Sequence, residues 1–135
     1  MFEITIERIF SAAHALRLPD GSFEPLHGHD WRVAVTVAAA QLDAMDTVMD
    51  FHKLEATLET IIGPWRNANL NQSRPFAGPD GQLTINPSAE RVAEQIGLGI
   101  AGTLDASIAL IEAAVGEAPG CTARYRPAGR PIDRD

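Results

Sequence analysis

The sequence predicts an α+β domain in which a four-stranded antiparallel sheet is covered on one face by two helices. Two stretches near the start and two near the end alternate apolar and polar side chains, as half-buried strands do. Between them lie two stretches whose apolar residues recur at helical spacing. The resulting order, two strands, two helices, two strands, favours helices packed together on one side of the sheet. We expect strands at 2–10, 27–40, 106–113 and 121–126, and helices at 50–63 and 86–102.

The first two strands are predicted to pair directly. In residues 2–10, Phe2, Ile4 and Ile6 alternate with polar residues, and the break near Phe10 suggests a β-bulge. Residues 15–26 contain proline, aspartate and glycine and form a connecting loop. Two long strands joined by such a loop most simply form an antiparallel pair.

The helix boundaries follow from capping residues. Asp50 is the expected N-cap of the first helix, and Gly63, followed by a proline, ends it. Asn86 is the expected N-cap of the second helix, with Pro87 at its first position. This helix keeps three glycines, each costing about 1 kcal/mol relative to alanine, so it either packs closely against a neighbour or is locally weak: Gly97, Gly99 and Gly102.

Composition limits the class of protein. The 135 residues fit one domain, which we place at 1–126, with a flexible tail at 127–135. No apolar run approaches the roughly 20 residues that span a bilayer, and no secretory signal is evident. The single cysteine, Cys121, excludes an internal disulfide and suggests the cytoplasm. A net charge of -7 argues against nucleic-acid and membrane binding.

Three of the four histidines are predicted to form a metal site. His27 and His29 are two residues apart, so they project from the same side of a strand and continue its apolar face. His14 ends the preceding strand segment. Three imidazoles without a nearby thiolate pair are typical of a catalytic zinc site with one open position. The alternative is a set of ordinary half-buried histidines.

One carboxylate interrupts an apolar row. Glu112 follows Ile108 and Leu110 at strand spacing. A carboxylate on an apolar face is costly unless something satisfies it. Glu112 therefore either grips a ligand or belongs to a salt bridge within the sheet.

Several motifs together resemble the 6-pyruvoyltetrahydropterin synthase family, which includes bacterial 6-carboxytetrahydropterin synthases. They occur in the family's order across residues 2–126. The matching stretches are Phe10-Ser11-Ala12-Ala13-His14, Leu26-His27-Gly28-His29, Met49-Asp50-Phe51-His52-Lys53-Leu54, Asn69-Leu70-Asn71, Asn86-Pro87-Ser88-Ala89-Glu90, Glu112 and Ala123-Arg124-Tyr125.

The resemblance implies a tunnelling fold and subunits assembled as trimers or hexamers, with sites between neighbours. It implies that His14, His27 and His29 bind Zn²⁺. It also implies a dihydroneopterin triphosphate substrate whose pterin ring is gripped by Glu112. A carboxylate suits that role because it accepts two parallel hydrogen bonds from an amino group and a ring N–H.

The chain departs from the family at two places. Phe23 stands where members carry a catalytic cysteine, and Cys121 is not its equivalent. Arg66 and Asn67 stand where members carry an Asp-His pair. Glu24 matches a subclass pattern, Glu-x-x-His-Gly-His, associated with cleaving the substrate side chain to 6-hydroxymethyl-dihydropterin.

Glu24 is therefore the candidate catalytic acid/base, and a plain loop residue is the alternative. Three cations are candidate partners of the triphosphate, although each also fits an ordinary surface charge: Arg17, Lys53 and Arg66. His52 is expected on a solvated helix face.

The sequence thus predicts a zinc-dependent lyase acting on 7,8-dihydroneopterin triphosphate by side-chain cleavage or elimination. Two alternatives remain. One is a family member that binds zinc and pterin without reacting, and the other is a zinc enzyme acting on another heterocycle. Folate, queuosine and biopterin pathways all stay open.

Overall fold

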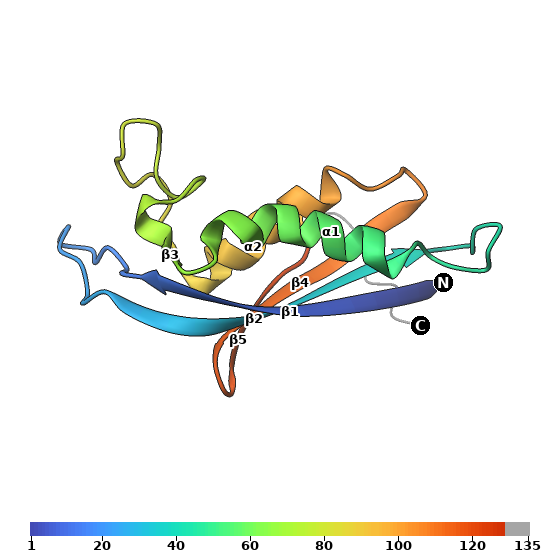
Figure 1. Cartoon of the computed structure of the whole chain (residues 1–135), viewed down its shortest axis with the longest axis horizontal. Helices are drawn as coiled ribbons and strands as arrows, with labels where there is room; N and C mark the ends of the chain where they lie inside the picture. Colours follow the sequence, from blue (N-terminus) through green and yellow to red (C-terminus); the bar gives the residue numbers. More distant parts are fainter. Residues whose placement is uncertain (129–135) are drawn as a thin grey trace.

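The computed structural model describes residues 1–128, so most of the tail expected at 127–135 lies outside the described residues. Two helices lie together over one face of a twisted sheet, as Figure 1 shows. Neither helix of the described part is long and apolar enough to cross a bilayer. In chain order, the elements are β1 (Phe2–His14), β2 (His27–Ala39), α1 (Phe51–Ile62), a short 3₁₀ turn η1 (Gly63–Trp65), β3 (Ala68–Asn69), a second 3₁₀ turn η2 (Leu70–Gln72), α2 (Ala89–Ala101), β4 (Ile108–Ala118) and β5 (Cys121–Tyr125).

The sheet contains the four predicted antiparallel strands and one more. Its order is β3-β1-β2-β4-β5, with antiparallel pairing from β1 through β5. The extra strand, β3, pairs parallel with β1 at Ala12 and Ala13. The sheet is therefore five-stranded and mixed, which corrects the predicted four-stranded antiparallel sheet. A two-residue strand is too short to leave an alternating pattern in the sequence.

The β1–β2 ladder runs without interruption. Phe2 faces Ala39 at one end and His14 faces His27 at the other, with no register shift between them. The bulge expected near Phe10 is absent. Instead, Phe10 is buried and Ile9 is 51% exposed on the opposite face, so the apparent break in the pattern reflects an apolar residue on the open side.

The core forms between the inner face of the sheet and both helices. Every second residue of β2 from Trp31 to Val37 is buried, as the alternation predicts. The helices contribute residues at helical spacing to the same cluster: Leu54, Leu58 and Ile62 from α1, and Val92, Ile96 and Ile100 from α2.

A bulge in β4 changes which side chains face the core. Leu110 pairs with Val37 and Glu112 pairs with Thr36, so one extra residue is inserted in β4. Leu110 and Val115 are both buried although they are an odd number of residues apart. The bulge therefore removes Glu112 from the apolar row. β4 also continues to Ala118, five residues beyond its predicted end.

The second helix begins later than predicted. Ser88 is the N-cap, and its hydroxyl accepts a hydrogen bond from the Arg91 backbone N–H. Asn86, the predicted cap, bonds instead to the backbone of Arg17. The first helix has its predicted cap, because the Asp50 carboxylate accepts from the His52 backbone N–H.

The glycines of α2 allow close packing. A Cβ added at Gly97 would collide with the ring of Tyr125 in β5, and one at Gly99 would lie 2.7 Å from Cδ1 of Ile61 in α1. Of the two explanations for these glycines, close contact with neighbouring elements therefore applies at both positions. At Gly102 an added Cβ would meet nothing nearer than 3.5 Å.

We predict that Gly97→Ala lowers the free energy of unfolding by about 1–3 kcal/mol, because overpacking against Tyr125 outweighs the gain in helix propensity. Gly102→Ala is the matched control, and it should be neutral or mildly stabilising. Denaturant unfolding at one fixed protein concentration measures both. Equal stability of the two variants would contradict close packing at Gly97.

Candidate metal centre and adjacent pocket

β1 leads into the 15–26 loop at one end of the sheet (Figure 1). Three histidines converge there: His14, His27 and His29. Their ring centroids lie 4.7 Å apart for His14 and His27, 4.8 Å for His27 and His29, and 5.2 Å for His14 and His29. The register of the β1–β2 ladder causes this, because it sets His14 opposite His27. The carboxylate of Glu117, from β4, joins the group, and one ligand atom from each residue lies within 4.8 Å of the others.

Backbone carbonyls orient two of the rings. Nδ1 of His14 lies 2.7 Å from the carbonyl oxygen of Pro87, and Nδ1 of His27 lies 2.8 Å from that of Pro25. A carbonyl can only accept, so Nδ1–H is the donor in both rings. In a neutral imidazole with this tautomer, Nε2 carries the lone pair, as in a metal-ligating histidine held by an outer carbonyl.

His29 contains a buried nitrogen without a hydrogen bond. Its Nε2 lies 2.9 Å from Oε1 of Glu117, but the geometry does not make a hydrogen bond to any described residue. Burial lowers the pKa of His29, and its proximity to His14 and His27 lowers it further, against the opposing effect of Glu117. A lowered pKa favours the neutral imidazole, whose unused lone pair is available to a metal ion.

The donor set fits zinc. Three imidazole nitrogens and one carboxylate oxygen are ligands that Zn²⁺ takes in catalytic sites. Trp31 closes one side of the group, because its fully buried ring lies edge-on to His14 at 4.9 Å and to His29 at 5.5 Å. Its indole N–H donates to the carbonyl of Ala12, which fixes the ring.

Glu117 was not predicted from the sequence. Its Oε1 lies 3.0 Å from Nε2 of His14 as well as 2.9 Å from that of His29. It shares the strand face of Val115, which pairs with Val33 of β2. The sequence contains a second glutamate five residues after Glu112, and this was the available signal. Because the bulge in β4 cannot be read from the sequence, the pattern did not reveal that Glu117, and not Glu112, points toward the histidines.

Glu112 does not join the histidines in the described chain. Its Oε1 lies 2.7 Å from a guanidinium nitrogen of Arg126 and 3.5 Å from one of Arg124. It pairs along β4 with Thr36, well away from the β2 end that carries His27 and His29. This is the salt bridge that the alternative interpretation of Glu112 predicted.

Glu24 lies beside the histidines. One oxygen of its carboxylate accepts a hydrogen bond from the Leu16 backbone N–H at 3.0 Å and lies 3.9 Å from Nε2 of His27. The Glu24 backbone N–H donates to the Leu16 carbonyl. Glu24 thus ties the loop to the residues just after β1 and keeps its carboxylate next to the histidines.

Two asparagines complete the support of this segment. The Asn71 amide bonds both the N–H and the carbonyl of Ala15, at 2.8 and 2.7 Å. The Asn86 amide does the same for Arg17, at 2.8 and 3.0 Å. For the residues that follow His14, these amide side chains therefore supply the backbone hydrogen bonds that a neighbouring strand would otherwise make. Both asparagines lie in the stretches that carried the family resemblance.

A pocket of about 560 Å³ adjoins Glu24. Arg17, Phe23 and Leu26 line it from the 15–26 loop, and Asn69, Asn71 and Leu83 line it from the segment after β3. Phe23, at the position of the missing cysteine, is 50% exposed. Cys121 lies exposed at the start of β5.

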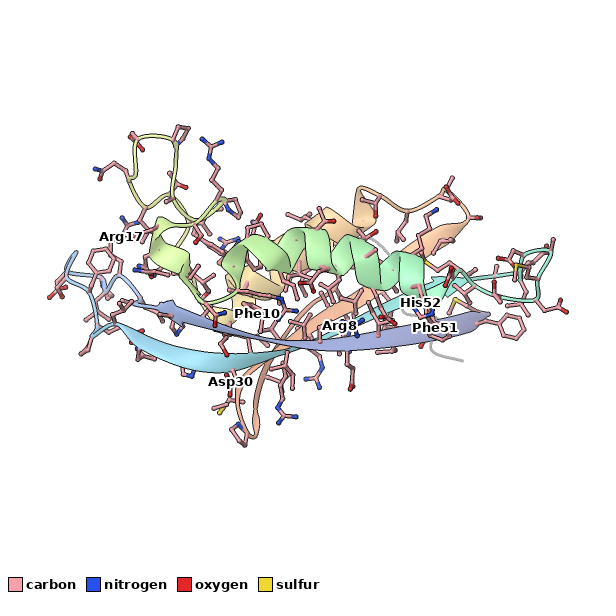
Figure 2. The ribbon with its side chains drawn as sticks, viewed as in Figure 1. Arg8, Phe10, Arg17, Asp30, Phe51 and His52 are labelled. Atoms are coloured by element: carbon pink, nitrogen blue, oxygen red, sulfur yellow. The ribbon has the colours of Figure 1, made fainter. Side chains whose placement is uncertain are left out.

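The other candidate cations lie elsewhere. Arg66 makes two hydrogen bonds to Glu59 and one to the Ile9 carbonyl, and the bonds from Arg66 lower the pKa of the Glu59 carboxyl. Lys53 and His52 lie exposed on the first turn of α1. Figure 2 shows Arg17 at one end of the molecule and His52 at the other.

Comparisons with known proteins point to one family. Residues 3–128 match the family model described as 6-pyruvoyl tetrahydropterin synthase. The 6-carboxy-5,6,7,8-tetrahydropterin synthase of Bacillus subtilis is 28% identical over 130 residues, covering 93% of this chain and 86% of that protein.

Two solved structures share the fold. The 6-pyruvoyl tetrahydropterin synthase of Caenorhabditis elegans has a TM-score of 0.74 at 21% identity, covering 95% of this chain and 98% of the other. A Plasmodium vivax 6-pyruvoyltetrahydropterin synthase, in a form with a catalytic glutamate changed to alanine, has a TM-score of 0.72 at 17% identity, covering 93% and 97%. Together with the family match over nearly the whole described chain, these findings establish that the protein belongs to the 6-pyruvoyl tetrahydropterin synthase family of pterin-processing lyases.

Proposed function

We propose that the protein is a zinc-dependent lyase that acts on 7,8-dihydroneopterin triphosphate, either by cleaving its side chain or by eliminating triphosphate from it. The observation that carries this proposal is the convergence of three imidazoles on one point, with the Glu24 carboxylate 3.9 Å from His27. His14, His27 and His29 are the proposed ligands of Zn²⁺. A bound zinc ion would supply a positive charge that lowers the pKa of a substrate hydroxyl.

Glu24 is the proposed base. It would accept the proton of the side-chain hydroxyl, the carbon–carbon bond would break as that oxygen becomes a carbonyl, and the dihydropterin ring would take up the electrons and a proton. The replacement of the usual cysteine by Phe23 supports a carboxylate in this role, because the pocket wall next to Glu24 offers no thiol. The catalytic glutamate of the related Plasmodium vivax enzyme supports it as well.

Glu117 is our proposed partner for the pterin ring, in place of Glu112. Its carboxylate is the one that β4 brings to the histidines, whereas Glu112 already neutralises Arg124 and Arg126. Two carboxylate oxygens can accept parallel hydrogen bonds from the amino group and ring N–H of a pterin. The proposed substrate would then bridge Glu117 and Glu24.

We also propose that copies of the chain assemble as trimers or hexamers with sites between subunits. Beside the histidines, Phe23 and Leu26 are at least half exposed, so they offer apolar surface to a neighbour. Within the described residues, β1 is paired along one edge only, except at Ala12 and Ala13. A free strand edge of that length favours association with another chain.

The metal assignment is tested by His14→Ala and His29→Ala. Loss of a residue that only hydrogen-bonds a metal ligand typically weakens metal binding by roughly 10- to 100-fold. Each of these changes should weaken zinc binding by more than that, because it removes a ligand itself. Zinc per chain after dialysis measures this, and His52→Ala is the control that should keep full zinc. Full zinc content in both ligand variants would rule the site out.

The Glu24 assignment is tested by Glu24→Gln. The amide oxygen can still accept the Leu16 N–H, so the loop should stay in place, but the base is lost. We expect kcat to fall by about 10²–10⁴-fold with zinc content unchanged. Product analysis with dihydroneopterin triphosphate measures the rate and separates cleavage from elimination.

An unchanged rate in Glu24→Gln would remove Glu24 from the mechanism. A zinc-loaded wild-type protein that binds the pterin without any turnover would instead favour a family member that has lost its chemistry. A zinc-loaded protein that binds no pterin would point to another heterocycle.

The two strand glutamates are separated by comparing Glu117→Gln with Glu112→Gln. We expect Glu117→Gln to weaken pterin binding by about 10-fold or more, since a charged hydrogen-bond acceptor is lost, while Glu112→Gln has little effect. Fluorescence titration with dihydroneopterin measures binding. The reverse order would return the role to Glu112, and loss of zinc in Glu117→Gln would make Glu117 a metal ligand.

A further inference from the structure

We propose that Arg17 binds the triphosphate end of the substrate in the pocket beside Glu24, and that it makes the enzyme selective for phosphorylated over unphosphorylated pterins. This inference rests on the proposed function, since it concerns one end of the same substrate. It also addresses a problem of charge. A chain with a net charge of -7 needs a local cation to hold a polyanion.

Arg17 is the cation of this pocket. Among the residues that the structure describes, no other arginine or lysine lines it. Arg17 forms no ion pair with a carboxylate of the described residues, whereas Arg8, Arg66, Arg91, Arg124 and Arg126 each do. Its guanidinium makes one long contact, 3.5 Å from Nη1 to the Leu83 carbonyl. Most of its five N–H donors therefore remain available to a ligand.

The backbone beneath Arg17 is held firmly. The Asn86 amide bonds both its N–H and its carbonyl, and Arg17 forms a β-bridge with Phe23 across the loop. A side chain on a fixed backbone loses less freedom on binding than one on a mobile loop. The backbone of Arg17 is therefore held in position for its side chain to bind a ligand. Arg74 is a suitable comparison, because it is also exposed but does not line this pocket.

The spacing suits the substrate. Three residues of extended chain carry the backbone roughly 10 Å from His14 to Arg17. A triphosphate attached to the three-carbon side chain has comparable length. Glu24 lies between the two positions, because it lines the pocket with Arg17 and stands 3.9 Å from Nε2 of His27. A substrate hydroxyl at Glu24 would therefore leave the phosphates within reach of Arg17.

The guanidinium group favours phosphate. Its planar fork makes two parallel hydrogen bonds to phosphate oxygens, and each is strengthened by charge. The alternative cations serve other contacts or regions: Arg66 is bound to Glu59, and Lys53 lies on α1. Another arginine-bearing hollow of the described residues, about 830 Å³ and including Arg32 and Arg124, does not have Glu24 in its lining.

The test compares Arg17→Gln with Arg74→Gln in the zinc-loaded protein. Both changes remove one exposed positive charge, but only the first lies in the pocket. For dihydroneopterin triphosphate, Arg17→Gln should lower kcat/KM by roughly 10- to 100-fold, mainly through KM, because a charged hydrogen-bonding group is lost. For unphosphorylated dihydroneopterin the two variants should match wild type. Arg17→Lys should restore part of the loss.

Calorimetry measures the binding of inorganic triphosphate, with zinc content checked before and after. This experiment separates the proposed anion site at Arg17 from the proposed lyase activity. Loss of this binding in Arg17→Gln but not in Arg74→Gln would support the anion site even if no pterin is turned over. Turnover of the triphosphate substrate that is unchanged in Arg17→Gln would overturn the Arg17 assignment and leave the lyase function standing. Failure of wild type to bind inorganic triphosphate or to prefer the phosphorylated pterin would also overturn it.

Discussion

The uninterrupted antiparallel pairing of β1 with β2 is the constraint on which the rest of the structure depends. It aligns thirteen residues of each strand and ends with His14 opposite His27. A slip of one residue would turn His27 and His29 to the other face, together with every apolar side chain of β2. The same register therefore builds the hydrophobic core and assembles the three histidines.

The site is held in place by polar contacts that come from distant parts of the chain. Carbonyls of Pro87 and Pro25 orient the rings of His14 and His27, and amides of Asn71 and Asn86 support the chain beyond His14. Each contact gives a hydrogen-bond partner to a polar group of this segment. The later start of α2 fits this arrangement, because it leaves Pro87 and Asn86 outside the helix and free to make these bonds.

Much of the fold could be predicted because its signals are local. Alternation on β2 identified the buried face from Trp31 to Val37, and the cap at Asp50 located the first helix. The failures arose where pairing with another strand overrides local pattern. The bulge in β4 shifted the parity after Leu110, so Glu112 turned toward arginines and Glu117 toward the histidines. Strand β3 was too short to leave any pattern.

The sequence by itself determined which residue types are available for chemistry. They are three histidines and the carboxylate of Glu24, with phenylalanine in place of a cysteine at position 23. Periodicity and motif order also determined the α+β class and the family. Only the tertiary structure decided which carboxylate meets the histidines, what holds their rings, and which arginine shares a pocket with Glu24. The physical reason is that strand register and bulges depend on partners far away in the chain, and a single strand's pattern does not contain them.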